Sequence, residues 1–230
     1  MVLKLIERNK YDSVREYVYN TLRENIMNLD LKPGTNITEK DIAEMMEVSR
    51  TPVREALLKL SQEDLLNIYP QKGTIVSLLD INYIEQAMFI RMSLEVAIVK
   101  LACQKFSEEI LYELRKNLND MAFQIKQLDI NTKRLFSYDT EFHKLLYKGT
   151  GMMQAWFVIT QVSTHLNRAR YLKLLTSDIH WEGIIKQHTE LVDALENRET
   201  EKAIKVLNAH LGGFDMEIYR LKENHQDLFV

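Results

Sequence analysis

The first 78 residues change from a helical to a strand-like pattern of hydrophobic positions. From residue 11 to residue 29, apolar side chains recur every three or four positions, which predicts one amphipathic helix. The apolar residues of this stripe are Val14, Val18, Leu22, Ile26 and Leu29. The segment 31–34 (LKPG) predicts the end of this helix, because Pro and Gly interrupt helical hydrogen bonding.

Two further helices and a short hairpin are predicted to follow. Thr38 is suited to cap the second helix, and the tight turn 47–49 leads into a third, whose first turn accepts Pro52. The buried stripe of the third helix comprises Val53, Ala56, Leu57 and Leu60. Residues 66–69 and 74–76 then read as two strands around a basic hairpin tip. Three helices and a β-wing predict a winged helix-turn-helix.

From residue 80 onward the hairpin signals vanish and the apolar spacing is helical throughout. Six helices are predicted, at 80–104, 107–129, 132–148, 152–175, 179–197 and 200–223. With 7 Gly and 3 Pro, the chain also has few residues that favour loops or β-turns. The predicted fold class is therefore mainly α, with an N-terminal winged helix-turn-helix (1–78) followed by an all-α helical bundle (79–230).

The composition is that of a soluble globular protein. Hydrophobic residues make up 46% and charged residues 27% of the chain, which is enough to bury a core. The N-terminus lacks the apolar core of a signal peptide, and no apolar run approaches the ~18 residues that span a bilayer. We therefore expect a cytoplasmic protein with no membrane contact. The single Cys103 excludes an intramolecular disulfide and a cysteine-rich zinc site.

A net charge of -3 is not the basic balance that indicates nucleic-acid binding from composition alone. DNA binding must therefore depend on the placement of particular residues. The third helix presents Arg50 and Arg54, four positions apart on one face, and Arg donates two hydrogen bonds to guanine in the major groove. The alternative is that these arginines only solvate a surface helix.

Other candidate DNA contacts surround these arginines. Ser49 and Thr51 supply hydroxyl groups beside the exposed amides of the helix start, which favour phosphate. Lys40 and Lys72 are placed to contact the DNA backbone or minor groove from either side.

The N-terminal motifs resemble those of the GntR superfamily of bacterial regulators over residues 11 to 78. They are LKPG at 31–34, SRTPVREAL at 49–57 and KG at 72–73. The resemblance implies DNA contacts at Lys40, Ser49, Arg50, Thr51, Arg54 and the wing residue Gly73. One departure is Asp64, where the family usually has Gly. Because Asp tolerates the left-handed conformation, we expect little effect.

Four polar residues fall within apolar stripes of the predicted bundle. Asp139 and His143 lie one helical turn apart, while His188 and His210 each lie among the inward residues of a later helix. An unpartnered buried carboxylate is costly, so Asp139 needs a cation or hydrogen-bond donors nearby. One Asp and three His suit Zn(II), and also Ni(II), Mn(II) or Fe(II). The alternative is that each His is a hydrogen-bonded core residue.

Residues 80 to 222 resemble the FCD effector domain of the FadR subfamily. Its metal-binding members carry Asp-x3-His on one helix and one His on each of the last two, which here are Asp139, His143, His188 and His210. Arg91 and Glu95 also lie in an apolar stripe. They form either a buried ion pair, or a site in which Arg91 grips an effector carboxylate beside the metal. Arg170 is a second candidate anion contact.

The predicted function is a ligand-responsive, DNA-binding transcriptional regulator. We expect a repressor that binds double-stranded DNA as a homodimer on a pseudo-palindromic operator, under the control of a small carboxylate effector. Two alternatives remain. In one, the metal itself is the signal. In the other, the chain is a metal-dependent enzyme fused to a DNA-binding domain. An enzyme would give the winged helix-turn-helix no function.

Overall fold

The computed structural model describes residues 3–69, 73–176 and 179–230. By their contacts, the residues form two compact units. The first comprises Met1–Glu85, Gln161–Leu172 and Ile218–Val230, and the second comprises Gln86–Thr160 and Lys173–Glu217. Segments from three parts of the sequence thus share the first unit. The domain boundary after residue 78 stays a prediction.

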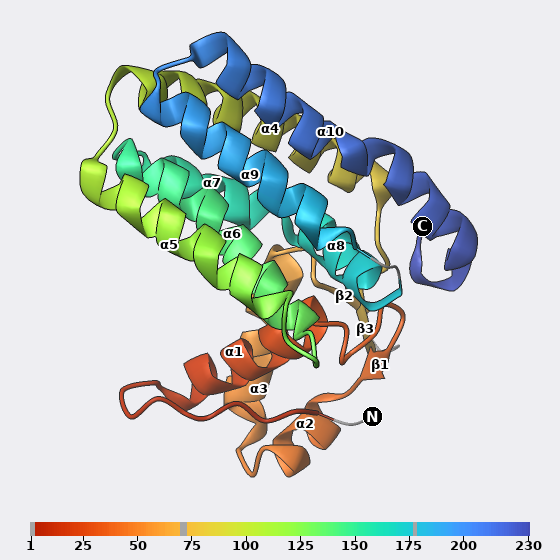
Figure 1. The fold of residues 1–230 in the computed structure, drawn as a ribbon. Helices are drawn as coiled ribbons and strands as arrows, with labels where there is room; N and C mark the ends of the chain where they lie inside the picture. Colours follow the sequence, from red (N-terminus) through yellow and green to blue (C-terminus); the bar gives the residue numbers. More distant parts are fainter. Residues whose placement is uncertain (1–2, 70–72, 177–178) are drawn as a thin grey trace. The chain divides into compact units, whose positions relative to one another are not determined.

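The N-terminal part of the first unit is a winged helix-turn-helix, as the hydrophobic pattern predicts (Figure 1). Its elements are α1 (Val14–Met27), β1 (Asn36–Ile37), α2 (Glu39–Met45), α3 (Arg50–Gln62), β2 (Leu66–Tyr69) and β3 (Gly73–Val76). Ser13 and Glu16 form a capping box at the start of α1, and Thr38 caps α2 by accepting a hydrogen bond from the backbone N–H of Asp41. The predicted cap Thr38 therefore lies at the start of α2, whereas the capping box at Ser13 was not predicted.

The three strands form an antiparallel sheet in the order β1-β3-β2. Asn36 pairs with Ile75 on one side of β3, and Ile68 pairs with Thr74 on the other. Strand β1 was not predicted, because two residues are too short for an alternating pattern. Leu22, Ile42, Val53 and Leu60 of the helices and Ile37, Leu66 and Val76 of the sheet belong to one buried core. This core fixes α3 against α1, α2 and the wing.

The remainder of the described chain is helical, which confirms the predicted fold class. Its elements are α4 (Ile81–Gln104), α5 (Glu108–Gln124), α6 (Thr132–Gly149), α7 (Met153–Val162), α8 (Thr164–Thr176), α9 (Trp181–Glu196), α10 (Thr200–Asn224) and the short 3-10 helix η1 (Gln226–Leu228). The prediction of one helix at 152–175 is wrong, because α7 and α8 are separated at Ser163. The sequence 158–164 is rich in β-branched residues and hydroxyl side chains, which lower helix propensity and compete for backbone hydrogen bonds.

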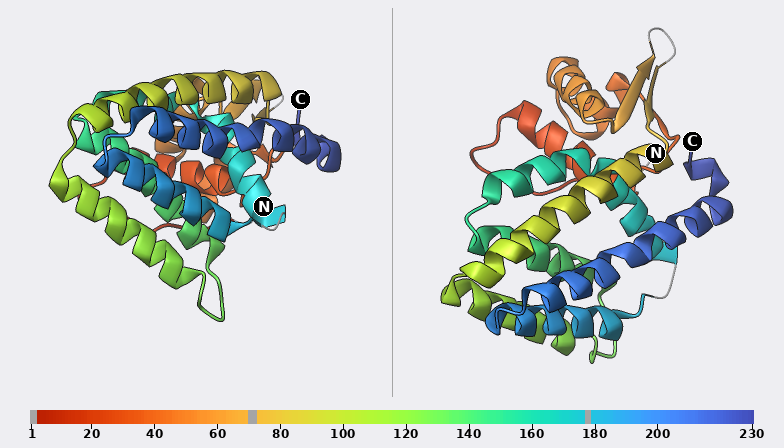
Figure 2. Two further views of the ribbon diagram at one scale, coloured as in Figure 1. Left: turned by 45° about the horizontal axis from the view of Figure 1, so that its top comes forward. Right: turned by 90° about the horizontal axis from the view of Figure 1, so that it is seen from above.

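In the second unit α5 packs against both α6 and α9 (Figures 1 and 2). Arg115 of α5 strengthens this packing through Asp193 and Glu196 of α9, each 2.6 Å from its Nη2 atom. Helix α5 thus holds the two helices that carry three of the four predicted metal ligands.

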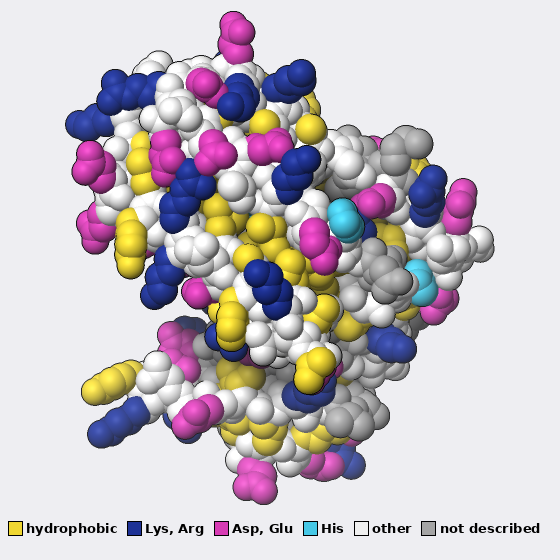
Figure 3. Space-filling model, viewed as in Figure 1, with side chains coloured by type: hydrophobic (Ala, Val, Ile, Leu, Met, Phe, Trp, Pro, Cys, Tyr) yellow, Lys and Arg dark blue, Asp and Glu magenta, His cyan; other side chains and the backbone are white. Residues whose placement is uncertain are grey.

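Over the face visible in the space-filling view, Lys and Arg side chains are interspersed with Asp and Glu (Figure 3). Among the helices of the described chain, none combines the length and the apolar character that crossing a membrane requires.

Candidate metal centre and DNA-reading surface

The predicted DNA-contacting residues around the start of α3 lie at the surface of the first unit. Arg50, Thr51 and Arg54 are exposed on the first two turns of α3, opposite its buried stripe. Ser49 is the exposed N-cap of α3, and its side chain accepts no capping hydrogen bond within the described chain. The Ser49 hydroxyl and the first amides of α3 are therefore placed as the phosphate-binding prediction requires.

Arg54 makes a contact that the sequence did not predict. Its Nε and Nη2 atoms donate hydrogen bonds to the two carboxylate oxygens of Glu39, at 2.8 and 3.0 Å. The hydrogen bond from Arg54 lowers the pKa of Glu39, and in turn Glu39 raises the pKa of Arg54. The pair joins the first residue of α2 to the second turn of α3.

The remaining predicted contacts are described in part. Lys40 is exposed on α2, with its Nζ 3.8 Å from Glu44 Oε1. Gly73 begins β3 with a φ of 110°, a conformation that L-residues rarely adopt, which explains glycine there. Lys72 lies outside the described residues. Asp64 has a φ of 56°, so the expectation that Asp replaces a left-handed glycine here is confirmed.

The four predicted metal ligands come together within the second unit. Asp139 and His143 project from α6, His188 from α9 and His210 from α10. One ligand atom of each lies within 4.8 Å of the ligand atoms of the others. Asp139, His143 and His188 are buried and His210 is nearly so, which makes the cluster an interior feature.

Three imidazole nitrogens point at a common centre. The Nε2 atom of His210 lies 3.2 Å from Nε2 of His143 and 3.2 Å from Nε2 of His188. Asp139 Oδ1 is 3.6 Å from His188 Nε2. Two nitrogens bound to one tetrahedral Zn(II) at about 2.0–2.1 Å would lie about 3.3 Å apart. The observed spacing therefore suits a single ion between these atoms.

Hydrogen bonds on the outer sides of two histidines decide which of their nitrogens carries a proton. His143 Nδ1 lies 2.6 Å from Glu95 Oε2, and His210 Nδ1 lies 3.0 Å from Gln187 Oε1. Both oxygens accept, so each Nδ1 carries the proton and donates it. The Nε2 atoms of both rings then present lone pairs to each other at 3.2 Å. Facing lone pairs repel, and a cation between them removes the repulsion, so the residues fit a bound divalent metal.

His188 is held by packing rather than by an outer acceptor. Its ring stacks on Phe142, with the ring centroids 3.8 Å apart and the planes at 2°. Its Nδ1 atom has no hydrogen-bond partner within the described chain.

Burial favours the neutral form of two of the predicted ligands, His188 and His210. Desolvation is the largest cause that lowers the pKa of His188 well below its usual value, and that lowers the pKa of His210 to about 3. Both rings are therefore neutral near neutral pH, each with one nitrogen free of a proton, which is the state in which imidazole binds a metal.

The ion pair between Arg91 and Glu95 is present and extends further than predicted. Arg91 Nε donates to Glu95 Oε1 at 2.7 Å, while the other carboxylate oxygen contacts His143. Burial alone would raise the Glu95 pKa, but His143 and Arg91 together hold it well below its usual value. The sequence analysis did not predict the contact between Glu95 and the candidate metal ligand His143, because the two residues are 48 positions apart.

Two other residues concern the predicted effector site. Tyr147, one turn beyond His143 on α6, is fully buried, and its hydroxyl has no hydrogen-bond partner within the described chain. Burial raises its pKa, with Glu95 as a further cause. Arg170 belongs to the part of α8 assigned to the first unit and lies 3.5 Å from Asn167 Oδ1.

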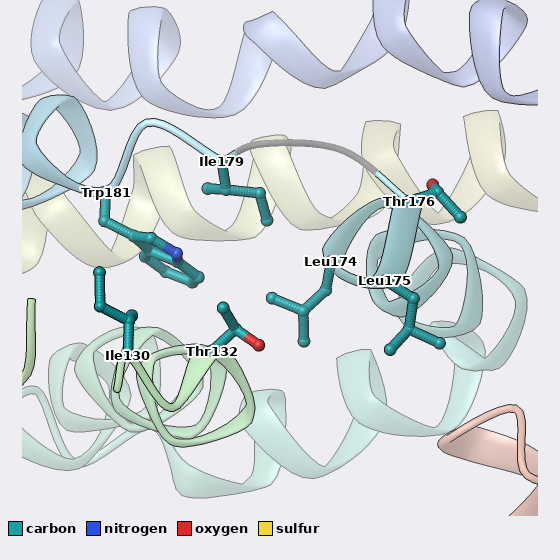
Figure 4. A pocket seen from close by; sticks show the side chains of 7 residues that line it. All are labelled: Ile130, Thr132, Leu174, Leu175, Thr176, Ile179 and Trp181. Atoms are coloured by element: carbon teal, nitrogen blue, oxygen red, sulfur yellow. The ribbon is translucent and has the colours of Figure 1, made fainter. Parts of the chain in front are cut away.

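A separate cavity of about 470 Å³ opens at the N-terminal ends of α6 and α9. It is lined by Ile130, Thr132, Leu174, Leu175, Thr176, Ile179 and Trp181. The side chains of Trp181 and Leu174 point toward each other across it (Figure 4). None of these residues belongs to the predicted sites.

Both parts of the sequence match known families. Residues 14–76 match the family described as "Bacterial regulatory proteins, gntR family", and residues 86–213 match the FCD domain. The first range contains the whole of α3, the candidate DNA-reading helix. The second contains the four predicted metal ligands Asp139, His143, His188 and His210, called the metal quartet below.

Sequence similarity to known proteins extends over nearly the full chain. The HTH-type transcriptional repressor RspR of Escherichia coli K12 is 29% identical over 223 residues, 96% of each protein. An HTH-type transcriptional regulator of Streptomyces ambofaciens is 30% identical, covering 94% of this chain and 89% of its own. The solved structure of E. coli McbR/YncC has a TM-score of 0.75 at 23% identity, covering 91% of this chain and 98% of its own. That structure supports the fold.

Proposed function

Because the chain belongs to the GntR family of DNA-binding transcriptional regulators and carries an FCD domain, we propose that a small carboxylate effector controls its DNA affinity from a divalent metal centre. The observation that carries this proposal is the convergence of three Nε2 atoms and one carboxylate in the protein interior. Similarity to a named repressor supports repression as the direction of control.

The proposed metal ligands are Asp139, His143, His188 and His210. One acidic and three neutral imidazole ligands suit Zn(II), with Ni(II), Mn(II) and Fe(II) as candidates of expanded coordination. When bound, such an ion supplies a positive centre with open positions for carboxylate oxygens. Glu95 and Gln187 hold two of the rings in the required orientation and tautomer.

Arg91 and Tyr147 are the proposed effector contacts contributed by the chain itself. The hydrogen bond to Glu95 uses Arg91 Nε, so the two terminal nitrogens of the guanidinium are available to a carboxylate. The unpartnered Tyr147 hydroxyl offers one more donor. Arg170 stays a lower-ranked candidate. The ion pair and the effector contact are thus compatible roles of Arg91.

Control of DNA binding requires that the effector distinguish two states of the protein. We propose a homodimer on a pseudo-palindromic operator, in which effector binding favours one arrangement of the two winged domains. The coupling between effector and DNA would be about 1–3 kcal/mol, which is typical of such regulators. Direct metal sensing is the second candidate, because the same quartet would respond to metal supply. The family names favour either over a metal-dependent enzyme.

The test of effector control is a thermal-shift screen of small carboxylates on the metal-loaded protein. A ligand that binds the native state raises the melting temperature by mass action. We expect hits that disappear after chelation and in Arg91→Ala, and that persist in Arg134→Ala, which changes an exposed arginine of α6. Hits must also change the affinity for DNA. If adding metal alone changes DNA affinity and no carboxylate does, the metal-sensor alternative replaces this proposal.

The residue-level DNA assignment has its own test. Arg50→Ala and Arg54→Ala should each cost about 1–3 kcal/mol of specific binding if the arginines read guanine. Footprints and affinities that are unchanged in both variants would remove α3 as the reading element.

A further inference from the structure

Arg54 is proposed above to read guanine, yet its guanidinium is bound by Glu39 of the same domain. A carboxylate on a DNA-facing surface is repelled by phosphate, so its presence beside a reading arginine needs a physical reason. Two roles are conceivable. Glu39 either competes with the base for Arg54, or fixes Arg54 in the orientation that the base requires.

The atoms used in the contact distinguish these roles. A guanidinium has five N–H groups in a rigid plane, arranged along separate edges. Glu39 occupies the edge formed by Nε and one hydrogen of Nη2. The end-on edge, formed by Nη1 and the second hydrogen of Nη2, can donate in parallel to O6 and N7 of guanine while the other edge is held by Glu39. Glu39 therefore leaves the reading edge of Arg54 free.

The surroundings of the pair give it a fixed position. Glu39 is the first residue of α2, directly after the cap Thr38, and its side chain is 31% exposed. The Arg54 side chain is 68% exposed and projects from α3. Both helices share the buried core of the winged domain, so their separation is set by packing. A long flexible side chain is thus held between two rigid elements.

We propose that Glu39 is a positioning residue for DNA recognition, which orients Arg54 so that its end-on edge faces a guanine in the major groove. The Arg54 side chain is then ordered when the protein folds, so DNA binding does not bear the entropic cost of ordering it. The proposal rests on the assignment of α3 as the reading helix. It predicts that Glu39 strengthens binding to specific DNA and weakens binding to nonspecific DNA.

The experiment begins with a duplex selected by the wild-type protein from a random-sequence pool. Glu39→Ala should bind this duplex about tenfold more weakly, and should lose the preference for guanine at the position where Arg54→Ala loses it. The same variant should bind a scrambled duplex equally well or better, because one negative charge near the phosphates is removed. Glu39→Gln, which keeps one acceptor oxygen, should fall between the wild type and Glu39→Ala.

Glu55→Ala is the matched control, because Glu55 is an exposed acid on α3 next to Arg54. It should raise binding to both duplexes without changing base preference. Tighter binding of Glu39→Ala to the selected duplex would show competition and overturn the proposal, as would unchanged affinity and base preference. If Arg54→Ala itself keeps full base preference, the assignment of Arg54 to guanine fails, and the proposal for Glu39 fails with it.

Discussion

The metal quartet and the DNA-reading surface are both built from charged or titratable side chains on helices, but they differ in burial. In the quartet, outer hydrogen bonds fix the proton positions on two rings, and the remaining lone pairs face one another. On the reading surface, Arg54 finds a local carboxylate and stays largely exposed. Burial removes the alternative of solvation, and the interior cluster has the geometry to hold a cation.

This difference in burial determines how much each region reveals about the ligand that it binds. In the interior, the 3.2 Å spacing of the Nε2 atoms and the hydrogen bonds that fix two tautomers fit a single divalent metal ion. At the surface, the same kind of reasoning gives an orientation for Arg54, but the base sequence of the operator depends on contacts that form only with DNA.

The largest expected effect is the loss of stability on metal removal. Metal that binds only the native state at about 1,000 times its Kd adds about 4 kcal/mol, so chelation should lower the melting temperature by about 10 °C. His188→Ala should abolish this metal-dependent shift, whereas His180→Ala, which changes an exposed histidine, should retain it. Elemental analysis should give about one ion per chain. Full metal content in His188→Ala would place the site elsewhere.

A second prediction tests whether burial also lowers the pKa of a histidine that lies outside the metal quartet. His165 is buried in the first unit, and its Nδ1 accepts a hydrogen bond from the Asp80 backbone N–H. Desolvation, followed by Arg168, lowers its pKa to about 4. The folded state therefore disfavours the protonated ring. The contribution of His165 alone should be constant above pH 6.5 and should fall by about 3 kcal/mol as the pH drops from 6.5 to 4.

Urea unfolding of chelated protein at several pH values measures this effect. His165→Gln should lose less stability between pH 6.5 and 4 than the wild type. His180→Gln, which changes an exposed ring, should follow the wild-type curve. Equal pH dependence in all three proteins would contradict the role of burial at His165.

The third prediction concerns the outer shell of the quartet. Glu95→Gln removes the charge that orients His143, and should weaken metal binding by about 10- to 100-fold. Gln187→Ala should have a smaller effect, because it removes a neutral acceptor from His210. Competition with a metal indicator provides the measurement, with circular dichroism to establish that the variants are folded. Glu113→Gln, at a surface pair with Lys148, is the control and should bind metal normally.

The sequence predicted the fold class from the spacing of apolar residues, and the quartet from polar residues within those apolar stripes together with the resemblance to the FCD domain. Apolar periodicity located the helices, and the i,i+4 spacing of Asp139 and His143 placed both on one face. The contacts that were missed join residues distant in sequence. Glu95 reaches His143 across 48 positions, and Glu39 reaches Arg54 across 15. Such pairs depend on how helices pack, which a single sequence does not contain.

The smallest expected effect lies at the edge of the reading surface. Lys40 is exposed and only loosely paired with Glu44, at 3.8 Å, so it is free to turn toward a phosphate. If Lys40 contacts the backbone, Lys40→Ala should weaken binding to selected and scrambled duplexes by the same modest factor. It should also reduce the slope of log K against log salt by about 0.9, the value for one phosphate contact.

Filter binding at four or more salt concentrations gives this slope for each variant. Arg54→Ala should instead change base preference, since its proposed contact is to a base. The two substitutions therefore separate positioning on the backbone from reading of the sequence. A base preference that changes in Lys40→Ala would place Lys40 in a groove. Because phosphates occur at every step of the duplex, an exposed lysine needs no fixed orientation, whereas Arg54 is held by Glu39.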